Sequence, residues 1–273
     1  MPGALVTGAG RGLGLAIARR LGERGLEVAV TDVDGDAAER AAAAIGSGAW
    51  ASPLDVTDAA ACRAAATAVA SRSGSLDVWV NNAGVLHPGL AFEQDPAEQR
   101  LMLEVNALGT INGTLAALEP MRAAGRGHVI NVVSLAGLVA APGEVAYSAS
   151  KHAAIAYTLG TLIDLRRAGE KGIHISALCP SGIWSPMLED KLDDPEAAAS
   201  FSGAMMTPGE VAEKAVGLLD RPRPLLSVPR WRGAYVRIFD VLPSFALRLL
   251  PLVMADARRR QRRFRRRLER QAG

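Results

Sequence analysis

The sequence predicts an α/β fold in which a doubly wound, parallel, seven-stranded sheet carries helices on both faces and is followed by a C-terminal extension. Short runs rich in Val, Ile and Leu alternate with longer amphipathic stretches along most of the chain. The runs do not alternate strictly between polar and apolar residues, which is typical of strands buried on both faces. Regular alternation of such strands with helices favours a parallel, Rossmann-type sheet.

Each element is placed by its own run of residues. The strands are expected at residues 4–7, 27–31, 49–54, 76–80, 128–133, 173–178 and 225–228. The helices are expected at residues 13–23, 36–44, 59–71, 96–121, 147–168 and 210–219. The segment at about 180–207 is too long for a plain connector and indicates a lid over a binding site. We therefore expect a Rossmann-fold catalytic domain over residues 1–228 and an extension over residues 229–273.

The net charge of +3 conceals an uneven distribution. Residues 255–273 contain nine arginines and two acidic residues, a net charge of +7, which leaves −4 for residues 1–254. A basic body would indicate nucleic-acid binding, and this distribution does not. We therefore expect no nucleic-acid partner.

Cysteine and histidine usage bear on the compartment and on metal binding. Cys62 and Cys179 stand far apart and form no CxxC pair, so a reducing, cytoplasmic setting is favoured over a disulfide framework. The four histidines lack the spacing of metal ligands, and no metal is expected. The sequence has no stretch of 18 apolar residues, which argues against a membrane-spanning helix.

A glycine-rich turn joins the first strand to the first helix and reads Thr7-Gly8-Ala9-Gly10-Arg11-Gly12-Leu13-Gly14. Glycines permit a tight turn and let the backbone approach a pyrophosphate, while the helix N-terminus offers free N–H groups. Glycine also occurs in ordinary turns, but its position between a first strand and a first helix favours dinucleotide binding. The expected cofactor contacts in this turn are Gly8, Arg11, Gly12, Leu13 and Gly14.

Asp32 closes the second strand, about 18 residues after Gly14. A carboxylate at this position can accept hydrogen bonds from the adenosine ribose and would repel a 2′-phosphate, which favours NAD over NADP. Arg11 favours NADP instead, because a basic residue in the turn could pair with that phosphate. Asp32 could instead cap the following helix. We expect NAD as the cofactor, with NADP as the alternative.

Tyr147 and Lys151 stand four residues apart at the start of a long predicted helix, which places them on one helix face. A free tyrosine has a pKa near 10, and lowering it by about three units requires roughly 4 kcal/mol of preference for the phenolate. One ammonium group at about 4 Å supplies an energy of that order. The spacing alone also fits an ordinary solvated helix face.

Further motifs accompany this pair in order along the chain. They are the glycine turn, Asp55 in Leu54-Asp55-Val56, Asn81-Asn82-Ala83-Gly84, Asn106 in Val105-Asn106-Ala107, Ser134 after the fifth strand, and Pro180 after the sixth. In this set, over about residues 3–228, the chain closely resembles the short-chain dehydrogenase/reductase family. The resemblance implies hydride exchange between an alcohol or carbonyl and a nicotinamide dinucleotide.

The resemblance implies catalytic roles for four residues. Tyr147 would exchange a proton with the substrate oxygen, and Lys151 would lower the Tyr147 pKa and hold the nicotinamide ribose. Ser134 would orient the substrate oxygen, and Asn106 would help to hold a water that links Lys151 to solvent. Taken alone, Ser134 fits a loop cap and Asn106 fits a polar position on an amphipathic helix.

The resemblance also implies contacts with the adenosine half of the cofactor and along the cleft. Asp55 and Val56 resemble the pair that contacts the adenine ring. The motif that contains Asn82, Ala83 and Gly84 resembles the one that stabilises the central sheet and lines the cleft.

The stretch after the sixth strand resembles the one that packs on the nicotinamide. Pro180 and Ser185 would contact the cofactor there, and the backbone of Ile183 would hold the carboxamide. Ser181 departs from the family pattern, which has glycine directly after the proline. We expect a local change of the backbone at Ser181, which puts the details of the nicotinamide contact in doubt.

The lid and the loops that face it predict an apolar substrate pocket. Leu135, Trp184 and Met187 are the expected substrate contacts, and the sequence shows no obvious Arg or Lys to bind a carboxylate or phosphate. An apolar alcohol or carbonyl compound, such as a retinoid-, steroid- or long-chain-like molecule, would suit this lining. The same residues could simply pack the lid against the body.

Residues 229–273 extend past the seventh strand. Residues 235–254 are apolar and broken by Pro243 and Pro251, and residues 258–270 form a cationic helix candidate that contains Phe264 and Leu268. This pattern is similar to an interfacial anchor and would suit peripheral contact with an anionic membrane. The alternative is that the apolar part packs on the body or on a partner subunit while the arginines are solvated.

The sequence thus predicts an NAD-dependent oxidoreductase that acts on an apolar alcohol or its carbonyl. The family resemblance suggests a homodimer through the helices at 96–121 and 147–168, or a homotetramer. An NADP-dependent carbonyl reductase is one alternative, and a non-catalytic dinucleotide sensor or scaffold on the same fold is another. The complete set of Asn106, Ser134, Tyr147 and Lys151 favours the enzyme, because a sensor has no need of it.

Overall fold

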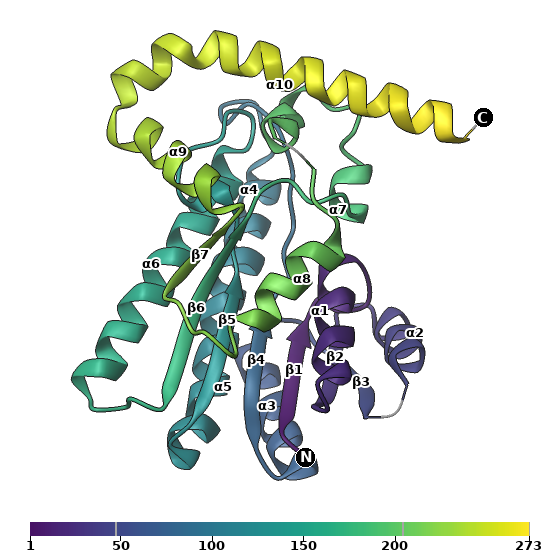
Figure 1. Ribbon diagram of the computed structural model, residues 1–273, viewed down its shortest axis with the longest axis vertical. Coiled ribbons are helices and arrows are strands. Elements are labelled where there is room, and N and C mark those ends of the chain that lie inside the picture. The colour runs from purple at the N-terminus through teal and green to yellow at the C-terminus, as the bar shows by residue number, and fades with distance from the viewer. Residues whose placement is uncertain (47, 204, 273) are drawn as a thin grey trace.

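Seven parallel strands form one sheet in the order β3-β2-β1-β4-β5-β6-β7 (Figure 1). The structure, a computed structural model, describes residues 1–46, 48–203 and 205–272. The strands are β1 Gly3–Thr7, β2 Glu27–Asp32, β3 Ala49–Pro53, β4 Leu76–Asn81, β5 Gly127–Val132, β6 Ile173–Pro180 and β7 Leu225–Val228. All seven predicted strands are present, with ends that differ by at most two residues.

The helices connect successive strands and complete the predicted doubly wound fold. They are α1 Gly12–Glu23, α2 Gly35–Ile45, α3 Ala59–Ser73, α4 Pro96–Met102, α5 Gly109–Ala124, α6 Val145–Arg167, α7 Pro186–Glu189, α8 Pro208–Gly217, α9 Arg230–Val241 and α10 Pro243–Ala272. Shorter elements are the π-helical segment η1 Leu103–Leu108 and the 3-10 helices η2 Leu135–Gly137 and η3 Pro195–Phe201.

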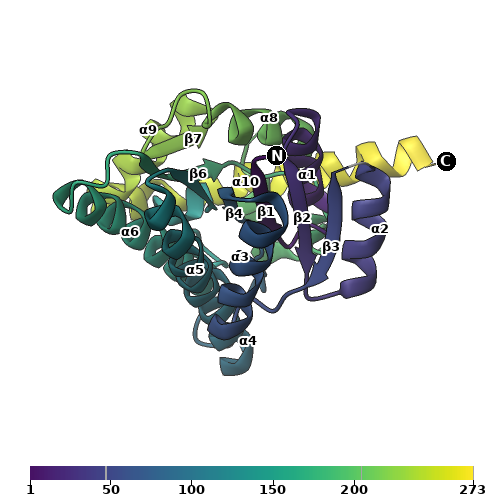
Figure 2. The same ribbon diagram turned by 90° about the horizontal axis from the view of Figure 1, so that it is seen from below.

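Side chains alternate between the two faces of the sheet and build a separate core on each. Ala4 and Val6 of β1 pack with α1, α2 and α8 on one face. Leu5 between them packs with α3, α5 and α6 on the other face. Figure 2, seen from below, shows the two helical layers with the sheet between them. Burial on both faces explains why the strand sequences lack a polar alternation.

The predicted helix over residues 96–121 is interrupted. The chain forms α4, then the π-helical turns of η1, and then α5. π-Helical segments within α-helices occur frequently at functional sites, and η1 carries Asn106. Gly109, directly after η1, lies against Val56, and a β-carbon at Gly109 would lie 2.6 Å from Val56 Cγ2. Sequence periodicity alone does not report this local change of winding.

The continuous helical stretch at residues 96–124 is long and apolar enough to cross a membrane by length and composition, alone among the helices of the described chain. More than half of its apolar window is buried, and α5 contacts β4, β5 and α3. Its apolar character is therefore explained by packing in the core of the fold.

The C-terminal extension forms two helices that arch over the carboxyl ends of the strands (Figure 1). α9 follows β7 directly, and α10 begins at Pro243 and runs for 30 residues. The expected break at Pro251 is wrong, because α10 continues through it. A proline inside a helix leaves the carbonyl four residues earlier without its partner. Here that residue is Leu247, which is exposed, so water can reach the carbonyl.

Candidate active site

One large cavity opens at the carboxyl ends of the strands, where the sheet order reverses between β1 and β4. Ligands of open α/β sheets bind at this position. The cavity has a volume of about 1520 Å³. Most of the sequence-predicted site residues line it, namely Gly8, Arg11, Gly12, Leu13, Gly14, Asp32, Asp55, Val56, Asn82, Ala83, Gly84, Ser134, Leu135, Tyr147, Lys151, Pro180, Ile183, Ser185 and Met187.

The glycine turn has the backbone geometry that a phosphate site requires. Gly8 and Gly12 each have φ of +60°, a conformation that side chains with a β-carbon rarely adopt. A β-carbon at Gly14 would overlap the carbonyl oxygen of Gly8 and the amide of Asn82. Arg11 precedes α1 without capping it through its side chain, so the first N–H groups of the helix are available to a ligand anion.

Asn82 and Thr7 fix this turn to the neighbouring strand. The Asn82 side-chain amide donates hydrogen bonds to the carbonyl oxygens of Thr7 and Gly8, both at 2.9 Å. The Thr7 hydroxyl accepts hydrogen bonds from the backbone N–H groups of Asn82 and Ala83 at 2.9 and 3.0 Å. The turn is therefore held in place before any ligand arrives.

Asp32 stands at the end of β2 and lines the same cavity. Its Oδ2 accepts a hydrogen bond from the Gly10 N–H at 3.0 Å, and its Oδ1 accepts one from the Asp34 N–H at 3.1 Å. Each carboxylate oxygen can accept more than one hydrogen bond, so Asp32 retains capacity for ribose hydroxyls. Asp34, rather than Asp32, caps α2 through the Ala37 N–H.

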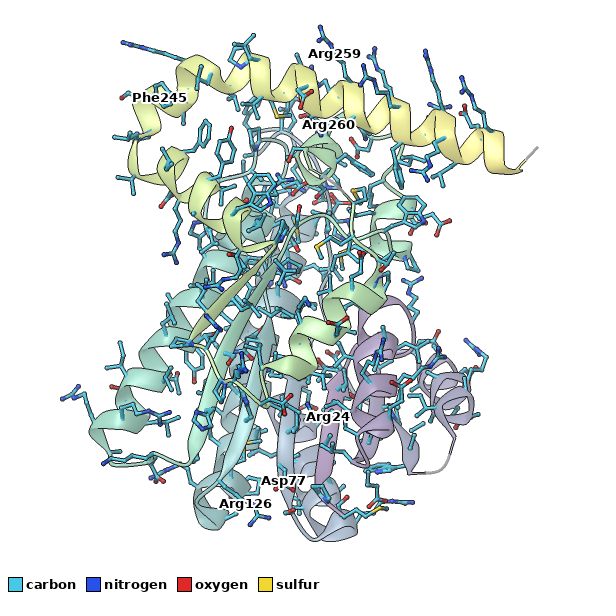
Figure 3. All side chains as sticks on the ribbon, viewed as in Figure 1. Arg24, Asp77, Arg126, Phe245, Arg259 and Arg260 are labelled. Carbon is cyan, nitrogen blue, oxygen red and sulfur yellow. The ribbon has the colours of Figure 1, made fainter. Side chains whose placement is uncertain are left out.

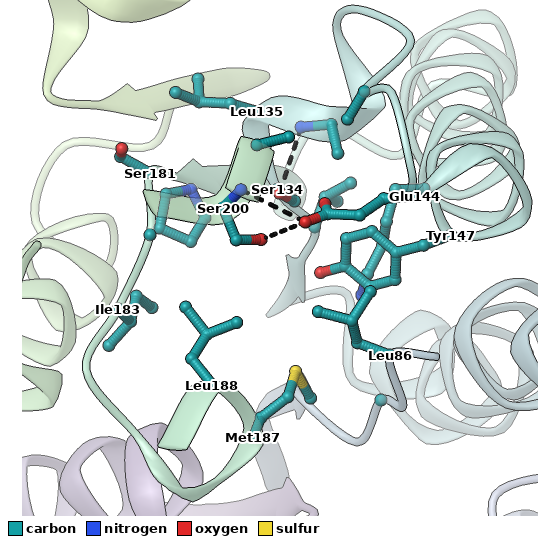
Figure 4. Close-up of a pocket in the computed structure, with 18 of the residues that line it drawn as sticks. Leu86, Ser134, Leu135, Glu144, Tyr147, Ser181, Ile183, Met187, Leu188 and Ser200 are labelled. Carbon is teal, nitrogen blue, oxygen red and sulfur yellow. Dashed lines mark hydrogen bonds between the residues drawn. The ribbon is translucent and has the colours of Figure 1, made fainter. Parts of the chain in front are cut away.

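Tyr147 and Lys151 lie on α6 with both side chains almost fully buried beside the cavity. Lys151 Nζ donates a hydrogen bond to the Val132 carbonyl oxygen at 3.2 Å and lies 5.6 Å from the centroid of the Tyr147 ring. Ser134 follows β5, and its hydroxyl acts to lower the pKa of Tyr147. The Ser134 hydroxyl, the Tyr147 phenol and the Lys151 ammonium group thus line one cavity, and Figure 4 shows the first two of them.

The expected lowering of the Tyr147 pKa by Lys151 is not met by the protein side chains alone. Burial raises the pKa of Tyr147, the Glu144 carboxylate raises it further, and the Ser134 hydrogen bond opposes them. Burial also lowers the pKa of Lys151 to about 8. Desolvation disfavours the charged form of each group, and it outweighs their mutual attraction when the ammonium faces a carbonyl oxygen.

Asn106 lies behind the cavity wall and is fully buried in η1. Its Oδ1 accepts a hydrogen bond from the Val85 N–H at 2.8 Å. Its Nδ2 donates to the Val85 carbonyl oxygen at 2.9 Å and to Ser150 Oγ at 3.1 Å. The Asn106 side chain therefore joins the loop after β4 to α6, and its amide is committed to protein partners.

The backbone beside Ile183 is paired with the segment around Met206. Trp184 donates its N–H to the Met206 carbonyl oxygen, and Met206 donates its N–H to the Gly182 carbonyl oxygen. The N–H and carbonyl of Ile183 take part in neither bond. Ser181 donates its N–H to the Val228 carbonyl oxygen at 2.8 Å, so the serine is accommodated beside the end of β7.

Trp184 was expected to contact the substrate, and the structure shows otherwise. Its ring does not line the cavity but packs edge-on against Phe264 of α10, with ring centroids 4.8 Å apart. A large aromatic ring gains more from this packing than from facing an open cavity. The extension therefore packs against a lid residue that the sequence assigned to the substrate.

Glu144 is a site residue that the sequence analysis missed. It precedes α6, is 2% exposed, and accepts hydrogen bonds at Oε1 from the Ser200 N–H at 3.2 Å and the Ser200 hydroxyl at 2.6 Å (Figure 4). Burial raises its pKa to about 7. An acidic residue three positions before the catalytic tyrosine candidate was the available signal.

The substrate pocket was expected to lack an arginine or lysine that could bind an anion, and this expectation is wrong. Arg232 of α9 and Arg260 of α10 both line the cavity. Arg232 donates a hydrogen bond to Ser202 Oγ at 3.0 Å, and Arg260 pairs with Asp256 at 2.6 Å. Both arginines belong to the extension, whose position over the site could not be predicted from the local sequence.

The comparisons with known proteins agree with this geometry. Residues 3–196 match the family model described as short chain dehydrogenase. The chain is 35% identical over 202 residues to cyclopentanol dehydrogenase of Comamonas sp., covering 73% of this chain and 80% of that protein. It is 38% identical over 200 residues to 2-(R)-hydroxypropyl-CoM dehydrogenase of Xanthobacter autotrophicus, covering 71% and 79%.

Solved structures show the same likeness. A short chain dehydrogenase/reductase from Burkholderia phymatum in complex with NAD aligns with a TM-score of 0.81 at 25% identity, covering 90% of this chain and 95% of that one. The crystal structure of levodione reductase aligns with a TM-score of 0.77 at 28% identity, covering 85% and 98%. The chain belongs to the short-chain dehydrogenase/reductase family, whose relatives named here are oxidoreductases of alcohols and carbonyls.

Proposed function

We propose that the chain is an NAD-linked dehydrogenase or reductase that interconverts an apolar alcohol and its carbonyl compound. The observation that carries the proposal is the convergence of Ser134, Tyr147 and Lys151 on the cavity that also contains the glycine turn and Asp32. A bound nicotinamide dinucleotide would supply the hydride acceptor or donor, together with a positive charge in its oxidised form.

The side chains of the site would orient the substrate, transfer the proton and position the cofactor. Ser134 orients the substrate oxygen, and Tyr147 donates a proton to that oxygen during reduction or accepts one during oxidation. Lys151 positions the ribose beside them and stabilises the deprotonated phenol. Asn106 is a positioning residue, because it links the Val85 loop to α6 and touches neither reacting group.

The preference for NAD is proposed from Asp32. Its carboxylate lines the cavity beside the glycine turn, where a 2′-phosphate would meet a negative charge. Arg11 lines the cavity as well and supports the alternative of an NADP-linked carbonyl reductase. The Burkholderia relative was solved in complex with NAD, which favours the first assignment.

The apolar substrate is proposed from the lining of the cavity around Tyr147. Leu86, Leu135, Met187 and Leu188 surround the space in front of the phenol (Figure 4). The names of the relatives, which include cyclopentanol dehydrogenase and levodione reductase, indicate alcohols and ketones without a strongly charged reacting end. The two arginines at the rim leave room for a polar group remote from the reacting carbon.

The oligomeric state and the cellular compartment are proposed from exposed apolar side chains and from the state of the two cysteines. The outer faces of α4, η1, α5 and α6 expose large apolar side chains, which suits a homodimer through these helices. These side chains are Leu101, Leu103, Leu108, Leu115 and Ile163. Cys62 and Cys179 are buried and unpaired, which suits a reducing cytoplasm. The division of the chain at residue 228 is likewise proposed, because β7 is the last strand of the sheet.

The test is to titrate NAD and NADP separately and then to follow nicotinamide reduction with a panel of apolar alcohols. We expect tight NAD binding, weaker NADP binding and turnover of at least one alcohol. Failure to bind either dinucleotide would overturn the proposal. Tight binding without turnover in either direction would favour a dinucleotide sensor, and a reversed cofactor preference would favour the NADP-linked reductase.

A further inference from the structure

Helices α9 and α10 present an apolar surface that the described part of the chain leaves uncovered. Val241 is 74% exposed, Phe245 is 49% exposed and Leu252 is 70% exposed. Trp231, Tyr235, Ile238, Leu242 and Leu247 of the same two helices are also exposed, and Trp231, Tyr235 and Leu247 line the rim of the cavity. Contiguous exposed apolar residues on this scale mark an interaction site, since single exposed residues are common but clusters are not.

Specific contacts fix the orientation of α10. Gln261 is 5% exposed, and its side-chain amide donates to the carbonyl oxygens of Leu192 at 3.1 Å and Asp194 at 2.8 Å. Phe264 packs on Trp184, and Ala257 is fully buried. These residues face the lid, so the opposite face of α10 is presented outwards.

The outward face of α10 is apolar in its first half and cationic in its second. Phe245, Arg259 and Arg266 are separated by multiples of seven residues, which places them near one side of the helix. Figure 3 shows Phe245 and Arg259 on the outer arch, while Arg260 points towards the body. This face therefore combines an apolar tip with a row of guanidinium groups.

Most of the arginines on α10 have no carboxylate partner among the described residues. Arg258, Arg260 and Arg265 form ion pairs with acidic side chains. The arginines without such a pair, all exposed, are Arg248, Arg259, Arg262, Arg263, Arg266, Arg267 and Arg270. The body of the protein carries a net negative charge, so this positive surface is local to the extension.

We propose that the α9–α10 surface docks the enzyme on an anionic lipid bilayer, with α10 lying in the interface. Apolar side chains would enter the acyl boundary, and the unpaired arginines would meet the lipid phosphates. A second copy of this chain fits the surface less well. A symmetric contact through α10 would oppose two positively charged helices.

The cavity adds a reason for this placement. Leu247, Leu250, Leu252 and Val253 of α10 line the same cavity as Tyr147 and Lys151. The apolar surface is therefore continuous with the lining of the candidate active site. A bilayer in contact with the extension would meet the rim of that cavity, where an apolar alcohol dissolved in lipid could enter.

The test measures co-sedimentation of the full-length protein with vesicles of phosphatidylcholine alone or of phosphatidylcholine mixed with phosphatidylglycerol. We expect strong binding to the anionic vesicles, weak binding to the neutral ones, and partial release by salt. Substrate and dinucleotide are absent from the assay, so its outcome does not depend on the proposed reaction. Absence of sedimentation with the anionic vesicles would overturn the proposal.

Two double variants separate the apolar and cationic parts of the surface. Arg259→Glu with Arg266→Glu should lower vesicle binding by about tenfold or more, because each basic residue near an anionic surface contributes about fivefold. Val241→Glu with Phe245→Glu should also lower it by tenfold or more. Neither pair lines the cavity, so turnover of a short, water-soluble alcohol should be unchanged.

Matched controls place the same substitutions elsewhere on the surface. Arg19→Glu with Arg63→Glu makes the same change in net charge, and Phe92→Glu changes a side chain that is 84% exposed. If these controls lower vesicle binding as much as the tail variants, the α9–α10 surface is not the docking site. The proposal also fails if the tail variants change the oligomeric state and leave vesicle binding intact. It fails again if duplex DNA binds as tightly as the anionic vesicles and Val241→Glu with Phe245→Glu affects neither.

Discussion

Glu144 links the start of α6 to the lid through the backbone and hydroxyl of Ser200. The carboxyl group is buried next to Tyr147, and its pKa is raised to about 7 from an ordinary value of 4.5. A raised carboxyl pKa means that the unfolded chain loses this proton at a lower pH than the folded protein does. The ionised group therefore weakens the fold progressively as the pH rises from about 4.5 through 7.

Glu144→Gln should remove this dependence while keeping an oxygen acceptor for Ser200. We expect the variant to gain stability relative to the natural protein by about 2 kcal/mol more at about pH 8 than at about pH 5. Denaturant unfolding at the two pH values measures the difference. An equal effect of the substitution at both pH values would show that Glu144 titrates normally in the folded protein.

Asp32 and Asp34 provide a matched pair for the cofactor preference. Asp32→Ala should weaken NAD binding and strengthen NADP binding, changing their ratio by about tenfold, because the negative charge beside the expected 2′-phosphate is lost. Asp34→Ala should cost about 1 kcal/mol of stability through the lost cap of α2 and leave the ratio unchanged. If both variants have the same ratio of NAD to NADP affinity, Asp32 does not determine the cofactor preference.

Most of the predicted site residues line one cavity, and the sequence could group them because their motifs are local. Gly8 and Gly12 adopt the positive φ angles that their turn requires, and Tyr147 and Lys151 share one wall as their spacing predicts. The positions of the Trp184 and Glu144 side chains could not be predicted from local motifs. Their surroundings are set by Phe264 and Ser200, which are distant in sequence, and no local pattern encodes those contacts.

Helix α10 holds the lid by contacts that resemble those of a folded core. Gln261 donates to carbonyl oxygens between α7 and η3, and Phe264 lies within 6.3 Å, ring centroid to centroid, of Phe201 in η3. Arg265 pairs with Asp193 at 2.6 Å on the exposed side, where ion pairs contribute little. The buried contacts therefore dominate the attachment of the lid to the extension.

Gln261→Ala should loosen the lid without unfolding the sheet. Removing a buried donor leaves carbonyl oxygens unsatisfied and costs about 1–3 kcal/mol locally. We expect faster proteolysis within residues 190–201 and a higher KM for the alcohol. Arg262→Ala, at the exposed neighbouring position, is the control and should leave both unchanged. Matching proteolysis rates in the two variants would show that α10 does not hold the lid.

Helix boundaries were predictable where a single pattern governs the element and failed where tertiary contacts intervene. The helix expected from residue 59 begins there as α3, where Asp58 caps it. The π-helical turns of η1 were not, since they depend on contacts such as Gly109 with Val56. Pro251 was expected to break the apolar stretch, but α10 continues through it.

Across the whole molecule, the doubly wound sheet followed from hydrophobic patterning, and it places the glycine turn, Asp32 and Tyr147 around one cavity. The arch of α9 and α10 over that cavity did not follow, because its packing partners, such as Trp184 for Phe264, lie far earlier in the chain. The sequence left packing of the extension and membrane contact as alternatives. Gln261 and Phe264 of the cationic part pack on the lid, whereas many apolar side chains of residues 235–254 are exposed, and the bilayer contact remains our proposal.

The central claim is that the Tyr147 hydroxyl transfers the proton in a reaction whose cofactor binds independently of it. The most direct measurement compares Tyr147→Phe with the natural protein in NAD titration and in alcohol turnover. We predict an NAD dissociation constant within about threefold of the natural value and a loss of turnover of at least about a thousandfold. Undiminished turnover by the phenylalanine variant would contradict the account.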